Sequence, residues 1–265
     1  KPGDQVGMMT PIYPPFFNLP TNQKRQITQV TLYEEDRNYT IDYEMLEQTF
    51  QDGVKLFILC NPHNPGGIVW TKDDLQRIVD LAIQYNVLIL SDEIHADILM
   101  KGHAYTPLLT LPNASKAKII TAIAPTKTFN LAGIQAAMMV VPNNELRSAL
   151  EQNAMAHGHT ELNVFASAAV QAAYTYGAPW LDELLQYIEI NMDYLTLKTQ
   201  IKYLSDQLDR NPIVIRAYDR SGRSIFLRLK TANGIKDLSL CLDAPSQGIW
   251  LADHCDDVEK NSLIV

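Results

Sequence analysis

The stretch Ala-Pro-Thr-Lys-Thr-Phe-Asn-Leu-Ala-Gly at residues 124–133 places a single lysine among small, hydroxyl and apolar residues. It follows an apolar run at residues 119–124 that is typical of a buried strand. A lysine at a strand end, in a partly dry pocket, loses its proton more easily than a solvated lysine. The neutral amine of Lys127 could then form a Schiff base with a carbonyl compound. Most lysines are solvated surface residues, so this reading needs support from elsewhere in the chain.

Composition limits the class of protein. The 265 residues suffice for one large domain, or for a large and a small one. A net charge of −8 argues against nucleic acid or an anionic membrane surface as the main partner, and no apolar run reaches the ~18 residues of a membrane span. The three cysteines have no paired or metal-binding spacing, which indicates a reducing, cytoplasmic compartment. Residues 1–4 read as a turn that follows other structure, so we expect a further N-terminal part.

Apolar runs alternate with helical patterns along most of the chain. Three prolines at residues 10–17 predict a loop there. Asp42, and Thr71 with Asp74, are expected to cap helices. The predicted strands lie at residues 5–9, 27–32, 54–60, 87–90, 119–124 and 136–141, and the later helices at 144–157, 161–176 and 179–208. This alternation predicts an α/β fold with a mainly parallel sheet and flanking helices.

Four side chains follow directly after predicted strands, namely Tyr13, Asn64, Asp92 and Lys127. Ligands of parallel sheets bind outside the carboxyl ends of the strands, so we expect these residues to converge. Pyridoxal phosphate requires such a set: an amine for its aldehyde, a carboxylate for its pyridine nitrogen, a donor for its ring oxygen and an aromatic ring to stack on it. Each residue also has a purely structural reading, as a helix cap, a turn residue or a packed ring. Their joint placement favours the cofactor.

Three motifs resemble those of fold-type-I, aspartate-aminotransferase-like pyridoxal-phosphate enzymes. They are Asn-Pro-His-Asn-Pro-Gly-Gly at residues 61–67, Ser-Asp-Glu-Ile-His-Ala-Asp at 91–97, and Thr-Lys-Thr-Phe-Asn-Leu-Ala-Gly at 126–133. Within that superfamily the chain is most similar to the cystathionine β-lyase, or C–S lyase, branch of class I/II aminotransferases. The segment Thr-Pro-Ile-Tyr-Pro-Pro-Phe at residues 10–16 is similar to that branch too, and the likeness extends over residues 1–192.

The resemblance implies roles for individual residues. Lys127 would carry the cofactor and act as the base, and Asp92 would face the pyridine nitrogen. The remaining implied cofactor contacts are Asn64 at the ring oxygen, Tyr13 on the ring face, His95 near the ring oxygen and Thr126 at the phosphate. Gln135 stands where many relatives carry a phosphate-binding arginine, which fits the lyase branch better. No metal is expected, because His157 and His159 lack a third ligand at a recognisable spacing.

The resemblance further implies a large cofactor-binding domain at residues 1–178, with its N-terminal part missing, and a linking helix with a partial, smaller α+β domain at 179–265. It implies a homodimer that cleaves cystathionine or cysteine-type thioethers to pyruvate, ammonia and a thiol. Two alternatives stay open: an aminotransferase on the same fold, and a non-catalytic fragment or regulatory module.

The chain also departs from the family's pattern. The glycine-rich phosphate loop should precede Lys1, and the C-terminal arginine that binds the substrate carboxylate is absent; Arg228 is its nearest look-alike, and we do not assign it that role. Residues 238–265 read as foreign to the family. These departures favour the non-catalytic alternative, whereas the intact Lys127, Asp92 and Asn64 speak against it.

Overall fold

A computed structural model describes residues 1–35, 38–159, 161–208, 217–218, 224–231, 234–242 and 249–250. The chain divides into two compact units, Lys1–Tyr187 and Ile188–Val265. Each unit is described by itself. The functional division expected between residues 178 and 179 stays a prediction.

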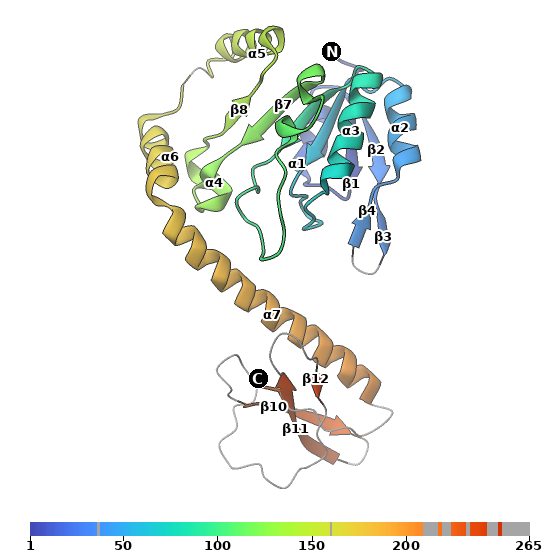
Figure 1. The fold of residues 1–265 in the computed structure, drawn as a ribbon, viewed down its shortest axis with the longest axis vertical. Coiled ribbons are helices and arrows are strands. Elements are labelled where there is room, and N and C mark those ends of the chain that lie inside the picture. Colours follow the sequence, from blue (N-terminus) through green and yellow to red (C-terminus); the bar gives the residue numbers. More distant parts are fainter. Residues whose placement is uncertain are drawn as a thin grey trace. The chain divides into compact units, whose positions relative to one another are not determined.

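The first unit is built around a six-stranded sheet with the order β2-β1-β5-β6-β7-β8 (Figure 1). The first five strands in this order run parallel, and β8 runs antiparallel to β7. The strands are β1 (Gln5–Thr10), β2 (Gln26–Thr31), β5 (Leu56–Cys60), β6 (Leu88–Asp92), β7 (Lys118–Ile123) and β8 (Met138–Val140). The mainly parallel α/β fold is therefore confirmed.

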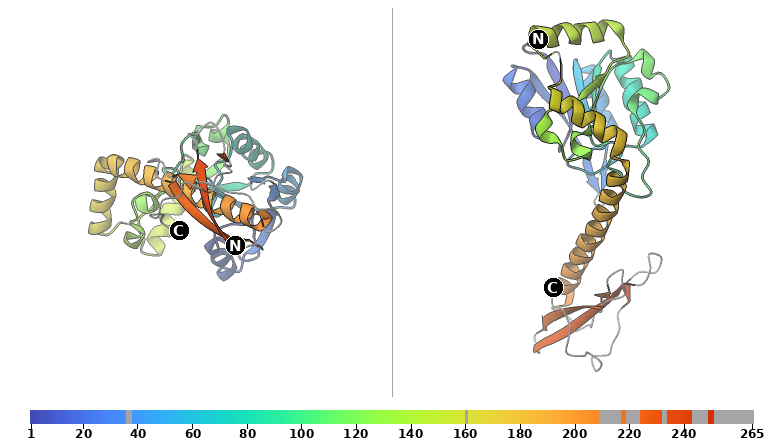
Figure 2. Two further views of the ribbon diagram at one scale, coloured as in Figure 1. Left: turned by 90° about the horizontal axis from the view of Figure 1, so that it is seen from below. Right: turned by 90° about the vertical axis from the view of Figure 1, so that its left-hand side faces the viewer.

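Helices lie on both faces of this sheet (Figure 2). The α-helices of this unit are α1 (Pro15–Asn22), α2 (Tyr43–Gln51), α3 (Lys72–Gln84), α4 (Pro125–Thr128), α5 (Asn144–Ala156) and α6 (Val164–Tyr176). Short 3-10 turns occur at η1 (Leu108–Thr110), η2 (Ala114–Lys116) and η3 (Ala132–Ile134). Helix α7 (Ala178–Leu208) begins in the first unit and ends in the second. No helix among the described residues is long and apolar enough to cross a membrane.

Two apolar cores hold the sheet between its helices. The larger core joins α2 and α3 to one sheet face through Phe50, Phe57 and Leu75, all fully buried. On the other face, Met8 and Ile58 pack with Phe16 from α1. Because successive residues of a strand point to opposite faces, the uninterrupted apolar run of β5 supplies both cores at once.

Both predicted helix caps are confirmed. The Asp42 carboxylate accepts the Met45 N–H at 2.9 Å and begins α2. Thr71 and Asp74 form a reciprocal capping box at the start of α3. These bonds satisfy backbone donors that would otherwise lack partners at the helix ends, so the entries into α2 and α3 are fixed.

Three local features differ from the sequence prediction. The segment predicted as a loop becomes helix α1 from Pro15, because proline at the first helical position has a suitable φ and needs no N–H donor. Lys127 lies in α4, a short helix entered directly from β7, rather than at the bare end of the strand. A small hairpin of β3 (Tyr33–Glu35) and β4 (Asn38–Thr40) was not predicted.

The second unit contains a four-stranded antiparallel sheet with the order β12-β11-β10-β9. Its strands are β9 (Ala217–Tyr218), β10 (Ser224–Thr231), β11 (Gly234–Leu242) and β12 (Ile249–Trp250). Arg228 lies on β10. Most of the tail expected to be foreign to the family lies outside the described residues.

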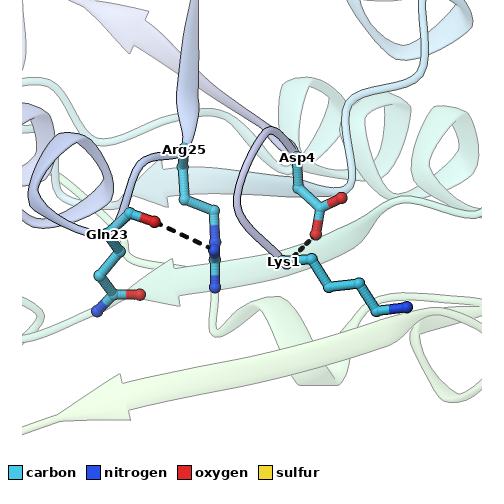
Figure 3. A network of polar contacts seen from close by, with 4 residues as sticks. All are labelled: Lys1, Asp4, Gln23 and Arg25. Atoms are coloured by element: carbon cyan, nitrogen blue, oxygen red, sulfur yellow. Dashed lines mark hydrogen bonds and ion pairs between the residues drawn. The ribbon is translucent and has the colours of Figure 1, made fainter.

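A small polar network surrounds the first turn of the chain (Figure 3). The amino group of Lys1 contacts the carboxylate of Asp4, and the Gly3 N–H bonds to the Lys24 carbonyl at 2.8 Å. The amino group lowers the pKa of Asp4. Because this ion pair is exposed, it contributes little to stability, and it lies apart from the site residues considered next.

Candidate functional site

The carboxyl ends of four neighbouring strands gather the predicted site residues at one edge of the sheet. Strands β1, β5, β6 and β7 lie side by side in this order and run parallel. Tyr13 follows β1, Asn64 follows β5, Asp92 ends β6 and Lys127 follows β7. Residues that are far apart in the sequence therefore meet, as the sequence predicted.

Asp92 is the buried charged group of this edge. Its side chain is 7% exposed, and its Oδ1 accepts the Ile94 N–H at 3.3 Å. Burial raises the pKa of the Asp92 carboxyl, while the Ile94 N–H and the charge of Lys127 oppose that rise. No lysine or arginine in the described part of the chain forms an ion pair with Asp92. A buried carboxylate with so little compensation fits a ligand that brings a cationic N–H.

Cys60 links Asp92 to the turn that carries Asn64. The Asn64 N–H donates to Cys60 Sγ at 3.4 Å, and the same sulfur lies 4.0 Å from Asp92 Oδ2. Burial, with a smaller contribution from the Asp92 charge, raises the pKa of the thiol to about 12. Cys60 therefore stays neutral, and Asp92 gains no second negative charge beside it.

The turn at residues 61–67 is held by bonds to several elements. Asn61 is fully buried; its N–H bonds to the Asp92 carbonyl at 2.9 Å, and its Oδ1 accepts the Trp70 N–H at 3.2 Å. The Trp70 indole N–H donates to the Cys60 carbonyl at 3.0 Å. His63 Nε2 lies 2.8 Å from the Pro11 carbonyl oxygen, close to Tyr13 in the chain. Asn64 is thus presented by a fixed backbone.

Lys127 lies above the Tyr13 ring, with Nζ 6.0 Å from the ring centroid. Tyr13 is 38% exposed and contacts the Phe16 ring edge-on at 6.0 Å. The lysine side chain is exposed. The prediction of a partly dry pocket is therefore wrong for the described residues, because α4 lifts Lys127 clear of the buried end of β7. Both side chains lie at the sheet edge that also carries Asp92.

His95 follows β6 in the chain, and Thr126 lies in the short helix α4. Burial lowers the pKa of His95, and the charge of Lys127 lowers it further. Thr126 is buried, and its carbonyl accepts the Leu131 N–H at 2.8 Å. Helix α4 and the segment after β6 are joined by Thr128, whose hydroxyl donates to Asp97 Oδ2 at 2.8 Å. No hydrogen bond from the Thr126 hydroxyl occurs among the described contacts, so that hydroxyl can serve a ligand.

Glu93, the neighbour of Asp92, has a different role. Its buried carboxylate accepts the Ser91 hydroxyl at 2.7 Å and the Leu108 N–H at 3.2 Å, and it contacts the Tyr105 hydroxyl. These three donors satisfy the carboxylate, so Glu93 anchors the chain that follows β6. Within the described residues no cluster of three or more His, Cys, Asp or Glu could hold a metal ion.

Sequence reasoning missed Cys60 and His63. A signal for Cys60 was available, since it ends β5 in register with Asp92 on β6. His63 lies in the Asn-Pro-His-Asn motif, but its contact with Pro11 spans 52 positions and requires the tertiary fold. Gln135, predicted to replace an arginine, is exposed in a left-handed conformation with φ 52°.

Comparisons with known proteins give a family model, curated relatives and solved structures that match this chain. Residues 1–210 match the family model of Aminotransferase class I and II. Cystathionine beta-lyase PatB of Bacillus subtilis is 43% identical over 194 residues, which are 73% of this chain and 50% of that protein. The chain spans about half the length of the curated relatives it matches.

Two solved structures share the fold. Cystalysin from Treponema denticola, which contains a pyridoxal 5'-phosphate cofactor, matches with a TM-score of 0.70 and 33% identity over 80% of this chain and 52% of that chain. The pyridoxal-phosphate-bound C–S lyase from Staphylococcus hominis matches with a TM-score of 0.69 and 28% identity over 79% of this chain and 50% of its own.

Proposed function

Because the chain belongs to the class I and II aminotransferase family, we propose that it is the cofactor-binding part of a pyridoxal-phosphate-dependent C–S β-lyase. The observation that carries this proposal is the buried, weakly compensated carboxylate of Asp92 at the edge that also bears Asn64, Tyr13 and Lys127. The similarity to a cystathionine β-lyase and to C–S lyases supports the lyase reaction. The substrate class would be thioether amino acids such as cystathionine or cysteine.

The residues present fit pyridoxal phosphate. Asp92 offers the carboxylate that a protonated pyridine nitrogen needs, and burial makes this pairing strong. Tyr13 offers an exposed ring face next to Lys127. The remaining polar contacts would be Asn64 and His95 at the ring oxygen and Thr126 at the phosphate. When bound, the cofactor supplies an electron sink for charge that develops on the substrate carbon.

The chain's own residues then have distinct tasks. Lys127 would hold the cofactor through its amine, and its Nζ would accept the Cα proton of the substrate as general base. Its exposed position leaves the amine free to move between these tasks. Asp92 would keep a proton on the pyridine nitrogen. The overall reaction would cleave the C–S bond with its electron pair going to sulfur, and water would be consumed as the substrate is converted to a thiol, pyruvate and ammonia.

Two alternative functions predict different reactions. An aminotransferase would consume a keto acid and release no pyruvate from a thioether. A non-catalytic module would bind the cofactor without turnover. Gln135 in place of an arginine favours the lyase over the aminotransferase.

We also propose a homodimer in the cytoplasm for the protein that contains this chain. The basis is the family resemblance and the cysteine pattern, in which Cys60 is a free, buried thiol. Sedimentation velocity of the protein with and without cofactor tests the dimer, and a single monomeric species at every concentration would contradict it.

The test of function is an absorption spectrum of the protein with pyridoxal phosphate, before and after borohydride. We expect a visible band that borohydride fixes covalently and that Lys127→Ala lacks. Lys118→Ala is a matched control, because that lysine lies at the start of β7 and bonds to Asn86 instead. Pyruvate release from cystathionine then distinguishes a C–S lyase from a non-catalytic module. Activity that depends on an added keto acid would reveal an aminotransferase. Absence of a lysine-dependent band would overturn cofactor binding by this chain.

A further inference from the structure

His63 ties together the two turns that carry Tyr13 and Asn64. Its imidazole is 2% exposed, and Nε2 lies 2.8 Å from the carbonyl oxygen of Pro11, two residues before Tyr13. His63 itself directly precedes Asn64. One side chain therefore joins the ends of β1 and β5, which are neighbours in the sheet.

The protonation state of the ring follows from its partner. A carbonyl oxygen only accepts hydrogen bonds, so Nε2 must carry the proton. Burial lowers the pKa of His63, whereas hydrogen bonding to the Pro11 and Cys60 backbone opposes that fall. Nδ1 is buried without a hydrogen-bond partner among the described residues. His63 Nε2 is thus placed as the donor to the Pro11 carbonyl.

The ring has little room to move. It packs against Trp70, with the ring centroids 5.6 Å apart. On another side, a Cβ added at Gly66 would lie 2.9 Å from His63 Cδ2, so the backbone of the turn closes against the imidazole. The backbone of His63 is paired too, since its N–H bonds to the Ile68 carbonyl at 2.7 Å.

The segment that His63 holds is also anchored on either side of Pro11. The Thr10 carbonyl accepts the Leu32 N–H at 2.9 Å, and the Tyr13 carbonyl accepts the Phe16 N–H at 3.0 Å. Between these anchors, the bond from His63 fixes Pro11 relative to the turn of Asn64. The separation of Tyr13 and Asn64 is therefore set before any ligand arrives.

We propose that His63 is a positioning residue that holds Tyr13 and Asn64 in a fixed relation to each other, so that both can contact one flat heteroaromatic ligand. This inference rests on the proposed function, in which that ligand is pyridoxal phosphate. A preorganised pair loses less conformational freedom on binding, so the tether contributes to ligand affinity without touching the ligand.

The test compares His63→Phe, which keeps a ring but loses the donor, with His63→Gln, whose amide can still donate. We expect His63→Phe to weaken pyridoxal phosphate binding by up to about tenfold and to change the visible circular dichroism of the bound cofactor, with His63→Gln closer to the parent. In a Tyr13→Ala background, His63→Phe should have little further effect on affinity. His103→Phe, at an exposed histidine, is the matched control.

Hydrogen exchange of the cofactor-free protein tests the tether independently. In His63→Phe, residues 10–19 should exchange faster, while α3 keeps the parent's protection. Equal exchange in the two proteins, or equal affinity losses with and without Tyr13, would overturn the proposal. If His63→Phe does not fold, His63→Asn replaces it, with a shorter amide that cannot span the gap. A parent protein that binds no cofactor would refute the proposed function, whereas the exchange result would still decide the tether.

Discussion

The turn after β5 and the segment after β7 carry Asn64 and Lys127 at the same edge of the sheet, but they are held differently. The first turn is fixed by Trp70, Cys60 and His63 through bonds to several elements. The second is held by its own helical turn, by one bond from Thr128 to Asp97, and by the packing of the Phe129 ring against Tyr174 and Trp180. The turn of Asn64 is thus fixed mainly by hydrogen bonds, whereas the Lys127 side chain stays exposed on its segment, free to move as a reacting group must.

The largest expected effect on stability is at Trp70. Trp70→Phe leaves the Cys60 carbonyl without its indole donor and loses buried packing, so we expect a loss of roughly 2–3 kcal/mol in the free energy of unfolding. Urea denaturation of the cofactor-free protein measures it. Phe165→Leu is the control, since the Phe165 side chain is 83% exposed, and should stay within about 0.5 kcal/mol. Equal costs at Trp70 and Phe165 would break the comparison.

A pH-dependent effect is expected at Asp92. Its folded pKa lies above the ordinary 3.8, so the folded protein binds more protons than the unfolded chain as pH rises from that value. The contribution of Asp92 to stability is therefore full below about pH 3.8 and is lost as pH rises through the folded pKa. Unfolding of the parent and of Asp92→Asn should be measured across this range without cofactor. The free energy of unfolding of the parent, relative to that of Asp92→Asn, should fall as pH rises. A relative free energy that grows with pH would contradict the raised pKa.

The smallest effect is expected at Thr128. Thr128→Val removes the hydroxyl that joins α4 to Asp97, but the exposed Asp97 carboxylate can bind water instead. We expect a loss of about 1 kcal/mol in the free energy of unfolding, with Thr110→Val as an exposed control. A cost as large as that of Trp70→Phe would show that the lysine segment is as firmly held as the turn after β5.

The sequence predicted the features that depend on local chemistry. Apolar runs located the strands of the large sheet, and Asp42 and Thr71 marked the starts of α2 and α3. The rule that ligands bind at the carboxyl ends of parallel strands then predicted that Tyr13, Asn64 and Asp92 lie at one edge, whereas the order of the strands came from the structure. Local signals and the final fold agree at these positions.

The remaining features depend on tertiary contacts or on position within a turn. Helix α1 starts at a proline and contains Pro20, so proline content alone suggested a loop. The exposure of Lys127 follows from the path of α4, which residue types do not specify. The bond from His63 to Pro11 joins positions too distant for any spacing rule. These are the contacts that give the site its geometry.

The place of β1 within the sheet has a consequence for how this chain folds. Strand β1 lies between β2 and β5, and Val6 pairs with Leu56, 50 positions later in the chain. Met8 and Met9 of β1 lie in different apolar cores, and both cores also contain residues of β5. Pairing between distant parallel strands closes long loops and is slow. The edge that gathers the site residues therefore forms only after segments far apart in the sequence have paired.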